Sequence, residues 1–322
     1  MIEKKNLIIN ETFASAVENH KKGNFQIAEK LYREILNIEP SHLQSTILLG
    51  TLAAQTKNFD LAKQLLQKAI KISPNNEQTH YKLGIVFKGL GEIQKSISCY
   101  EKAIQLNSNY IDAHNNIGNL LKESGEVQKA MDYFKNAIQI NPNDASVYNN
   151  LGNCHEELEN FKKAASCYEK AIEINPNFAD AYNNLGIVFK RLGKVQKAIS
   201  CYKKTIQLQT NHADAHNNLG VVFKELGEIQ EAISCFEKAI EINPNYVIVY
   251  NNLGLLFREL NEFKKSVCYY EKALNLDPNR EEICEGYGDL LLKLNQHIKA
   301  LTYIKKGAGF ISFTQKDVKI IC

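Results

Sequence analysis

The pattern of apolar and polar positions along this chain repeats every 34 residues, the separation of Gly50 and Gly84. Within each period, one stretch carries apolar or aromatic residues at positions four, seven and eleven. A second stretch carries them at positions 17, 20, 24, 27 and 28. Spacings of three and four residues place such side chains on one face of an α-helix. Each period therefore predicts a pair of amphipathic helices.

Glycine and proline set the frame of the repeat. Eight glycines follow one another at this step without a slip: Gly50, Gly84, Gly118, Gly152, Gly186, Gly220, Gly254 and Gly288. With these glycines at position eight, nine repeats cover residues 9–42, 43–76, 77–110, 111–144, 145–178, 179–212, 213–246, 247–280 and 281–314, the last of them degenerate. The six prolines share one place in this frame: Pro40, Pro74, Pro142, Pro176, Pro244 and Pro278. Because the residue before a proline disfavours the helical region, the second helix should end there.

Residue sizes within the frame predict how the two helices pack. A glycine inside a helix costs about 1 kcal/mol relative to alanine, so its repeated use at position eight indicates a close approach of another helix. Position 20 is small, as in Ala198, and position 24 is mostly aromatic, as in Tyr202. A further glycine at position 15 of five repeats suits a turn that needs a positive φ. Those turn glycines are Gly23, Gly91, Gly125, Gly193 and Gly227.

This pattern resembles the tetratricopeptide repeat family over residues 9–314. The segment Tyr182-Asn-Asn-Leu-Gly186, with Ala198 and Tyr202 after it and Pro176 before it, has the family motif with tyrosine in the usual tryptophan place. The resemblance implies an all-α, right-handed superhelical solenoid of nine helix-turn-helix repeats. The Asn-Asn-Leu-Gly run is most similar to the arrays of O-linked N-acetylglucosamine transferases. Such a scaffold generally binds proteins, and the fold alone does not name the partner.

A polar stripe on the first helix of each repeat is the candidate binding surface. Positions 2, 5, 6, 9, 12 and 13 cluster opposite the buried face, and in the family this face lines the concave groove. Position six is asparagine in five consecutive repeats, position nine is apolar in several, and position twelve is mostly basic. The groove stripe is defined here as Asn116, Asn150, Asn184, Asn218, Asn252, Ile187, Val221, Leu255, Lys122, Lys190, Lys224 and Arg258.

Asparagine suits the recognition of peptide backbone because its amide both donates and accepts hydrogen bonds. With repeats about 10 Å apart and an extended strand rising about 3.3 Å per residue, successive asparagines would meet every third peptide group. The sequence therefore predicts binding of an extended peptide. The alternative is that these asparagines serve solubility or local hydrogen bonding. A carboxylate clamp of the family would need lysine at position five, where this chain has asparagine or Tyr81, so we expect no such clamp.

Composition and charge argue against nucleic-acid binding, membrane insertion and secretion. The chain has 23% charged residues and a net charge of +3, without a polybasic patch, which argues against nucleic-acid binding. No segment approaches the roughly 18 apolar residues that a membrane span requires. Residues 1–10 lack the apolar core of a secretory signal. We therefore expect a cytoplasmic protein that binds neither nucleic acid nor membranes.

Cysteine and histidine residues are the remaining candidates for chemistry. Four of the eight cysteines, Cys99, Cys167, Cys201 and Cys235, share position 23, and we expect them to be reduced thiols that fill packing sites. Histidines at position four, His80, His114 and His216, alternate with tyrosines and are expected to pack rather than to bind metal. No phosphate loop, nucleophile motif or paired-carboxylate motif is present. The array itself predicts no enzyme and no cofactor.

The two ends of the chain differ from the repeats. Residues 1–8 form a lead-in, and residues 308–322 form an apolar tail with two short predicted strands, 310–313 and 318–321. This tail is either an irregular cap on the last repeat or a junction to a catalytic domain. Two hypotheses follow: a scaffold that holds extended protein segments, or the substrate-recruiting part of an enzyme such as a protein glycosyltransferase. In the second case a partner or a downstream domain would supply catalysis.

Overall fold

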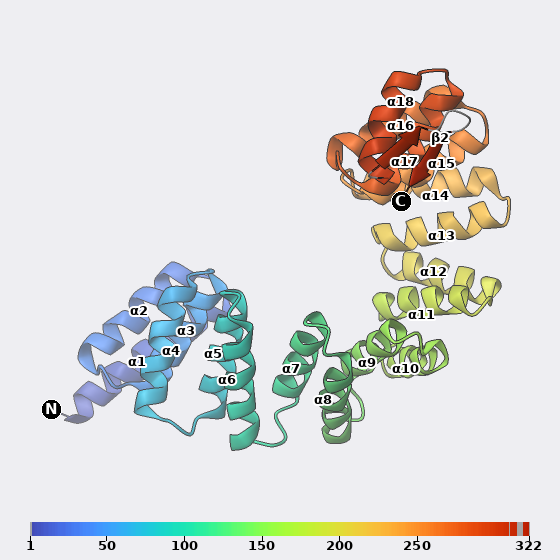
Figure 1. Cartoon of the computed structure of the whole chain (residues 1–322). Helices are drawn as coiled ribbons and strands as arrows, with labels where there is room; N and C mark the ends of the chain where they lie inside the picture. The colour runs from blue at the N-terminus through green and yellow to red at the C-terminus, as the bar shows by residue number, and fades with distance from the viewer. Residues whose placement is uncertain (1, 309, 314–317, 322) are drawn as a thin grey trace. The chain divides into compact units, whose positions relative to one another are not determined.

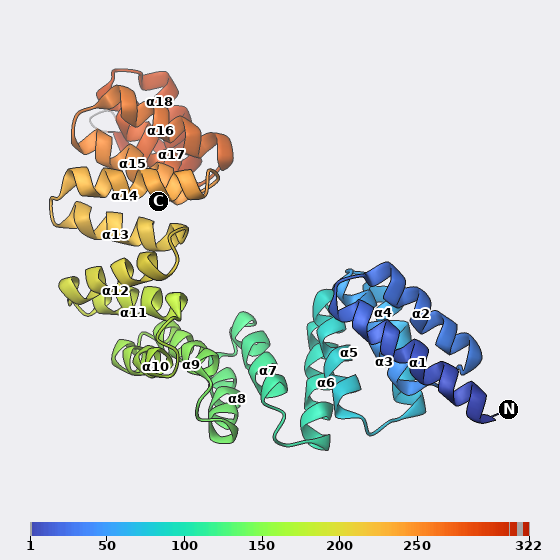
Figure 2. The same ribbon diagram turned by 180° about the vertical axis from the view of Figure 1, so that it is seen from behind.

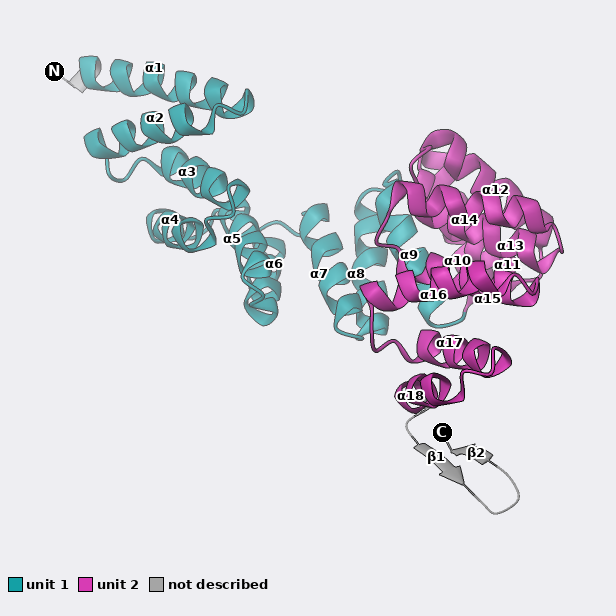
Figure 3. Ribbon diagram, turned by 90° about the horizontal axis from the view of Figure 1, so that it is seen from above, with its two compact units in different colours: residues 1–159 teal, residues 160–322 magenta. Residues whose placement is uncertain are grey.

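The computed structural model describes the backbone of residues 2–308, 310–313 and 318–321, and the side chains of residues 4–307. Figure 1 and the reverse view in Figure 2 show that helices make up most of this part of the chain. The chain divides into two compact units, Met1–Glu159 and Asn160–Cys322, which Figure 3 colours separately. The two units are described one at a time below.

The first unit contains nine helices in its described residues. They are α1 (Ile2–Lys21), α2 (Phe25–Ile38), α3 (Leu43–Gln55), α4 (Phe59–Ile72), α5 (Glu77–Gly89), α6 (Ile93–Leu106), α7 (Ile111–Glu123), α8 (Val127–Ile140) and α9 (Ala145–Glu157). From α3 onward, every first helix begins at the first position of the repeat frame. Helix α1 begins at Ile2, so it includes residues ahead of Ile9, where the frame places the first repeat.

The second unit continues the same alternation. Its helices are α10 (Phe161–Ile174), α11 (Ala179–Arg191), α12 (Val195–Leu208), α13 (Ala213–Glu225), α14 (Ile229–Ile242), α15 (Val247–Glu259), α16 (Phe263–Leu276), α17 (Glu281–Lys293) and α18 (His297–Ala308). Strands β1 (Phe310–Phe313) and β2 (Val318–Ile321) follow and pair antiparallel, with Phe310 opposite Ile321. The two predicted strands are therefore confirmed. The side chains of the tail lie outside the described part, so its role as cap or junction stays a prediction.

Neighbouring helices pack as a solenoid requires. Within each unit, a first helix packs on the second helix of its own repeat, and that second helix packs on the first helix of the next repeat. First helices of adjacent repeats also touch, as α11 touches α13 and α13 touches α15. The predicted all-α architecture of nine helix pairs is confirmed over the described residues.

The glycine at position eight lies against the aromatic residue at position 24 of the same repeat. A Cβ atom added to Gly186 would lie 2.6 Å from the ring of Tyr202, and one added to Gly118 would lie 2.6 Å from the ring of Phe134. These rings are at most 1% exposed, and the small residue at position 20, such as Ala198, is fully buried. Glycine is required here because the ring of position 24 occupies the space that a side chain would take.

The turn between the two helices needs one residue in the left-handed region. The five glycines at position 15 have φ values between 70° and 80°. Lys57, Glu159, Asn261 and Asn295 take the same position in the other repeats, with φ values between 56° and 61°. The geometry of the repeat therefore imposes a positive φ even where the sequence does not supply glycine.

Candidate functional site: the groove stripe

The groove stripe lies on first helices in both units. In the second unit, α11, α13 and α15 each contribute an asparagine at position six, an apolar residue at position nine and a cation at position twelve, all of them half-buried. In the first unit, α7 contributes Asn116 and Lys122, and α9 contributes Asn150. Because adjacent first helices touch within a unit, the structure brings the stripe residues of each unit onto one continuous row of helices.

The asparagines at position six are bonded from repeat to repeat. Nδ2 of Asn218 donates to Oδ1 of Asn183 at 3.1 Å, and Nδ2 of Asn252 donates to Oδ1 of Asn217 at 3.0 Å. In the first unit, Nδ2 of Asn150 donates to Oδ1 of Asn115 at 3.0 Å. Each bond joins residues 35 apart in sequence, from position six to position five of the preceding repeat. We call this set of bonds the amide ladder.

Position five of the repeat is more buried than its place in the helical pattern predicts. The pattern put it on the exposed stripe, yet Asn149, Asn183 and Asn217 are only 7–8% exposed. For Asn183 and Asn217 the expectation of exposure was wrong because the next first helix covers this position and supplies a hydrogen-bond donor to it. An amide buried in this way needs a partner, and position six provides it.

The amide ladder fixes how position six presents its amide. An asparagine amide has two N–H donors and a carbonyl acceptor. In Asn218 and Asn252 one N–H is directed at the preceding repeat. The same planar group also carries the carbonyl oxygen Oδ1, an acceptor that the ladder bond does not use. The ladder therefore fixes the amide groups of Asn218 and Asn252, whose side chains are half-buried, in place along the stripe.

The ladder ends at the ninth repeat. Position six of that repeat is Gly286, which has no amide to offer, and Oδ1 of Asn251 is buried without a hydrogen-bond partner within the described part of the chain. Nearby, the Arg258 guanidinium donates to the backbone carbonyl of Gly286 at 3.2 Å. The last inter-repeat bond in this row thus comes from position twelve and not from position six.

Three cations at position twelve of the second unit form ion pairs with the following repeat. Lys190 pairs with Glu225 at 2.8 Å, Lys224 pairs with Glu259 at 2.8 Å, and Arg258 approaches Asp289 at 3.4 Å. The acidic partners keep half of their side-chain surface exposed. Surface pairs of this kind contribute about 0.2–1 kcal/mol each. A ligand carboxylate can therefore compete for these cations at small cost.

The residues at position four have a structural role that sequence reasoning did not predict. Nε2 of His80, His114 and His216 contacts the carbonyl oxygen six residues earlier, at 2.9, 3.2 and 3.2 Å. The hydroxyl of Tyr250 makes the equivalent bond to Pro244 at 3.1 Å. Either histidine or tyrosine can occupy position four because both carry a ring with a polar group that reaches the carbonyl oxygen of the inter-repeat turn.

The cysteines and the other candidate metal ligands show no arrangement for catalysis or metal binding in the described residues. Burial raises the pKa of Cys99, Cys167, Cys201 and Cys235 to about 11, which suits packing thiols and not nucleophiles. Among residues 4–307, no three His, Cys, Asp or Glu side chains come together in a group that could hold a metal ion. Over the same part, no helix is both long and apolar enough to cross a membrane.

Comparison with known proteins gives the family. The model for the C-terminal domain of cilia and flagella-associated protein 70 matches residues 76–287, which is more than half of the chain. A general tetratricopeptide-repeat model matches residues 21–77. The chain belongs to this family of tetratricopeptide repeats. The predicted family is thus confirmed, while the specific similarity to O-linked N-acetylglucosamine transferases stays a prediction. No curated protein matches the sequence.

Solved structures show the same tetratricopeptide fold. The Cut9–Hcn1 hetero-tetramer of the APC/C aligns with 84% of this chain and 52% of the other, at a TM-score of 0.62 and 18% identity. PilF of Pseudomonas aeruginosa aligns with 68% of this chain and 96% of its own, at a TM-score of 0.58 and 22% identity. YrrB, a TPR protein with an unusual peptide-binding site, covers 57% of this chain and 95% of its own, at a TM-score of 0.47 and 24% identity. The first two alignments show a likeness in fold alone.

Proposed function

We propose that this tetratricopeptide-repeat protein is a protein-interaction scaffold that binds extended peptide segments along the groove stripe. The observation that carries the proposal is the regular sequence of groups on α11, α13 and α15: an oriented amide, an apolar side chain and a cation, repeated on adjacent helices. Membership in a repeat family that serves as a general binding scaffold supports the same conclusion.

Each type of stripe residue has a distinct part in peptide binding. The oriented Oδ1 atoms of Asn218 and Asn252 accept hydrogen bonds from peptide N–H groups, which every residue except proline provides. The half-buried Val221 and Leu255 contact apolar side chains of the peptide. Cations such as Lys224 attract a ligand carboxylate away from an exposed glutamate partner. Backbone acceptors of this kind give affinity with weak sequence preference.

The amide ladder also accounts for why the stripe is regular. Because position six is bonded to position five of the preceding repeat, the same side chain both stabilises the repeat interface and shapes the binding surface. The alternative, a role in local hydrogen bonding, thus accounts for the Nδ2 donor of these asparagines, which bonds to the preceding repeat. The proposal concerns the carbonyl oxygen, which the ladder bond does not use.

A direct test uses the full chain and a displayed library of random extended peptides. Peptides selected on the wild type should bind a triple variant Ile187→Ser, Val221→Ser, Leu255→Ser at least tenfold more weakly. This variant changes the stripe without touching the amide ladder. A matched control changes three exposed turn asparagines, one in each of three consecutive repeats, to alanine (Asn177, Asn211 and Asn245) and should bind like the wild type.

Two results would contradict the proposal. Equal affinity of wild type and stripe variant, with unchanged circular dichroism, would show that peptides bind elsewhere. Selection of no peptide at all would show that the stripe is not a peptide-binding surface. If the array recruits substrates for a glycosyltransferase, the selected peptides should in addition be rich in serine and threonine, which separates the alternative hypothesis from a general scaffold.

A further inference from the structure

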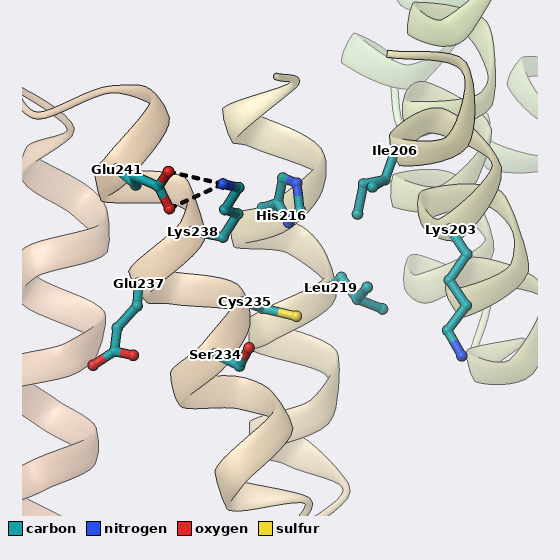
Figure 4. A pocket seen from close by; sticks show the side chains of 9 residues that line it. All are labelled: Lys203, Ile206, His216, Leu219, Ser234, Cys235, Glu237, Lys238 and Glu241. Atoms are coloured by element: carbon teal, nitrogen blue, oxygen red, sulfur yellow. Dashed lines mark hydrogen bonds and ion pairs between the residues drawn. The ribbon is translucent and has the colours of Figure 1, made fainter. Parts of the chain in front are cut away.

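A hollow in the second unit lies beside Cys235, at a position where other repeats of this chain carry a tyrosine. It lies between α12, α13 and α14, has a volume of about 510 Å³, and its walls include Lys203, Ile206, His216, Cys235 and Lys238. Figure 4 shows Ile206 and Lys203 on α12, across from His216, Leu219 and Cys235 on the other two helices; Nζ of Lys203 lies 5.9 Å from the centroid of the Phe223 ring. No residue of the groove stripe lines this hollow, so it is separate from the proposed peptide site.

Equivalent positions in other repeats show what fits there. In the eighth repeat, position 23 is Tyr269, whose ring stacks on Phe257 with centroids 5.4 Å apart and planes 4° apart. The same ring lies 6.4 Å from Tyr250 at position four, and Nζ of Lys272 lies 5.5 Å from its centroid. The chain thus fills this place with a tyrosine of its own, beside an aromatic ring and a lysine.

The fourth repeat gives a second example with a histidine wall. Tyr133 at position 23 packs against His114 at position four, with ring centroids 5.9 Å apart. Its hydroxyl donates to Glu101, the residue at position 25 of the preceding repeat, at 3.4 Å. The seventh repeat keeps this frame, with His216 at position four, but it has Cys235 at position 23 and Lys203 in the place of Glu101.

The walls of the hollow suit a neutral phenol. Burial is the main cause that lowers the pKa of His216 and so favours its neutral form, and the imidazole ring forms one wall of the hollow. Lys238 occupies the position of Lys272 and is held by Glu241 at 2.9 Å, as the dashed lines in Figure 4 show. Lys203 replaces an acceptor by a donor at the place where the phenol oxygen of Tyr133 lies in its own repeat. An oxygen there would accept a hydrogen bond from Lys203.

We propose that the hollow between α12, α13 and α14 binds a tyrosine side chain of a partner protein. The ring would lie over Cys235 between His216 and Ile206, and the phenol oxygen would accept from Lys203. The occupant is inferred from the chain itself, which places Tyr133 and Tyr269 in the equivalent hollows of two other repeats. This surface would give the scaffold a second point of contact that does not compete with a peptide in the groove stripe.

The test is a titration of the full chain with N-acetyl-tyrosinamide, followed through the δ1 methyl resonance of Ile206 in isoleucine-labelled protein. The shift should saturate. N-acetyl-phenylalaninamide should bind several-fold more weakly because it lacks the phenol oxygen, and N-acetyl-leucinamide more weakly still. The Cys235→Tyr variant fills the hollow as Tyr269 does and should bind the probe at least tenfold more weakly. The matched Cys167→Tyr variant, two repeats away, should bind like the wild type.

A second variant keeps the test independent of folding effects. Lys203→Met retains the wall of the hollow but removes the donor, so it should abolish the preference for tyrosinamide over phenylalaninamide. A shift that does not saturate, that persists in Cys235→Tyr, or that is equal for leucinamide would overturn the proposal. None of these outcomes depends on peptide binding at the groove stripe, so the two proposals fail or succeed separately.

Discussion

The amide ladder makes a quantitative prediction about the interface between the sixth and seventh repeats. Changing Asn218 to alanine removes the donor to Oδ1 of Asn183, a residue that is 7% exposed. A buried acceptor left without its partner costs about 1–3 kcal/mol. We therefore expect Asn218→Ala to lower the free energy of unfolding by about 1–2 kcal/mol. Asn177→Ala, an exposed turn asparagine, should change it by less than about 0.5 kcal/mol.

A double-mutant cycle isolates the bond itself. Asn183→Ala removes the acceptor, and the double variant removes both partners, so no amide is left unpaired. The cost of the double variant should fall short of the sum of the single costs by about 0.5–1.5 kcal/mol. The measurement is urea unfolding followed by far-ultraviolet circular dichroism. Hydrogen exchange should show the loss first in α11 and α13, because each repeat contacts only its neighbours.

The refuting result is additivity. If the double variant costs the sum of the two single changes, the asparagines do not interact and the ladder has no energetic role.

The converse change tests the end of the ladder. Gly286→Asn supplies the missing donor to Asn251, and Tyr270→Phe makes room, since a Cβ at Gly286 would lie 2.8 Å from the Tyr270 hydroxyl. This pair of changes should stabilise the last two repeats relative to Tyr270→Phe alone.

Three further predictions test packing, ionisation and the tail. Gly186→Ala should destabilise the protein by about 1–3 kcal/mol in thermal or urea unfolding, because the new Cβ would lie 2.6 Å from the Tyr202 ring. Because the pKa of Cys235 is raised to about 11, only about one Cys235 thiol in a thousand is ionised at pH 8. Iodoacetamide should therefore modify the exposed Cys268 before Cys235. The rate of alkylation at Cys235 should rise about tenfold per pH unit until pH 11. Equal rates at pH 8, by mass spectrometry, would contradict this. Deleting residues 308–322 should lower solubility and speed hydrogen exchange in the ninth repeat; unchanged exchange in a monomeric product would instead favour a docking tail.

The sequence by itself determined the helices, their ends and the packing within a repeat. Helix periodicity, proline after the second helix and the size match between Gly186 and Tyr202 all act within the length of one repeat. A repeated local rule is visible in one chain because the repeats are independent examples of it. The positive φ at position 15 shows the same logic, since the frame identified the turn even where Lys57 replaces glycine.

Only the tertiary structure decided how repeats bond to each other. The helical pattern indicates the direction in which a side chain points, but it does not indicate which residue of the next repeat will meet it. Three features depended on that meeting: the buried amide at position five, the ion pair from Lys224 to Glu259, and the hollow beside Cys235. The first two join residues that are 35 apart in sequence, one residue more than the repeat period of 34. This offset depends on how adjacent first helices pack against each other, which is a property of the repeat interface and not of any single repeat.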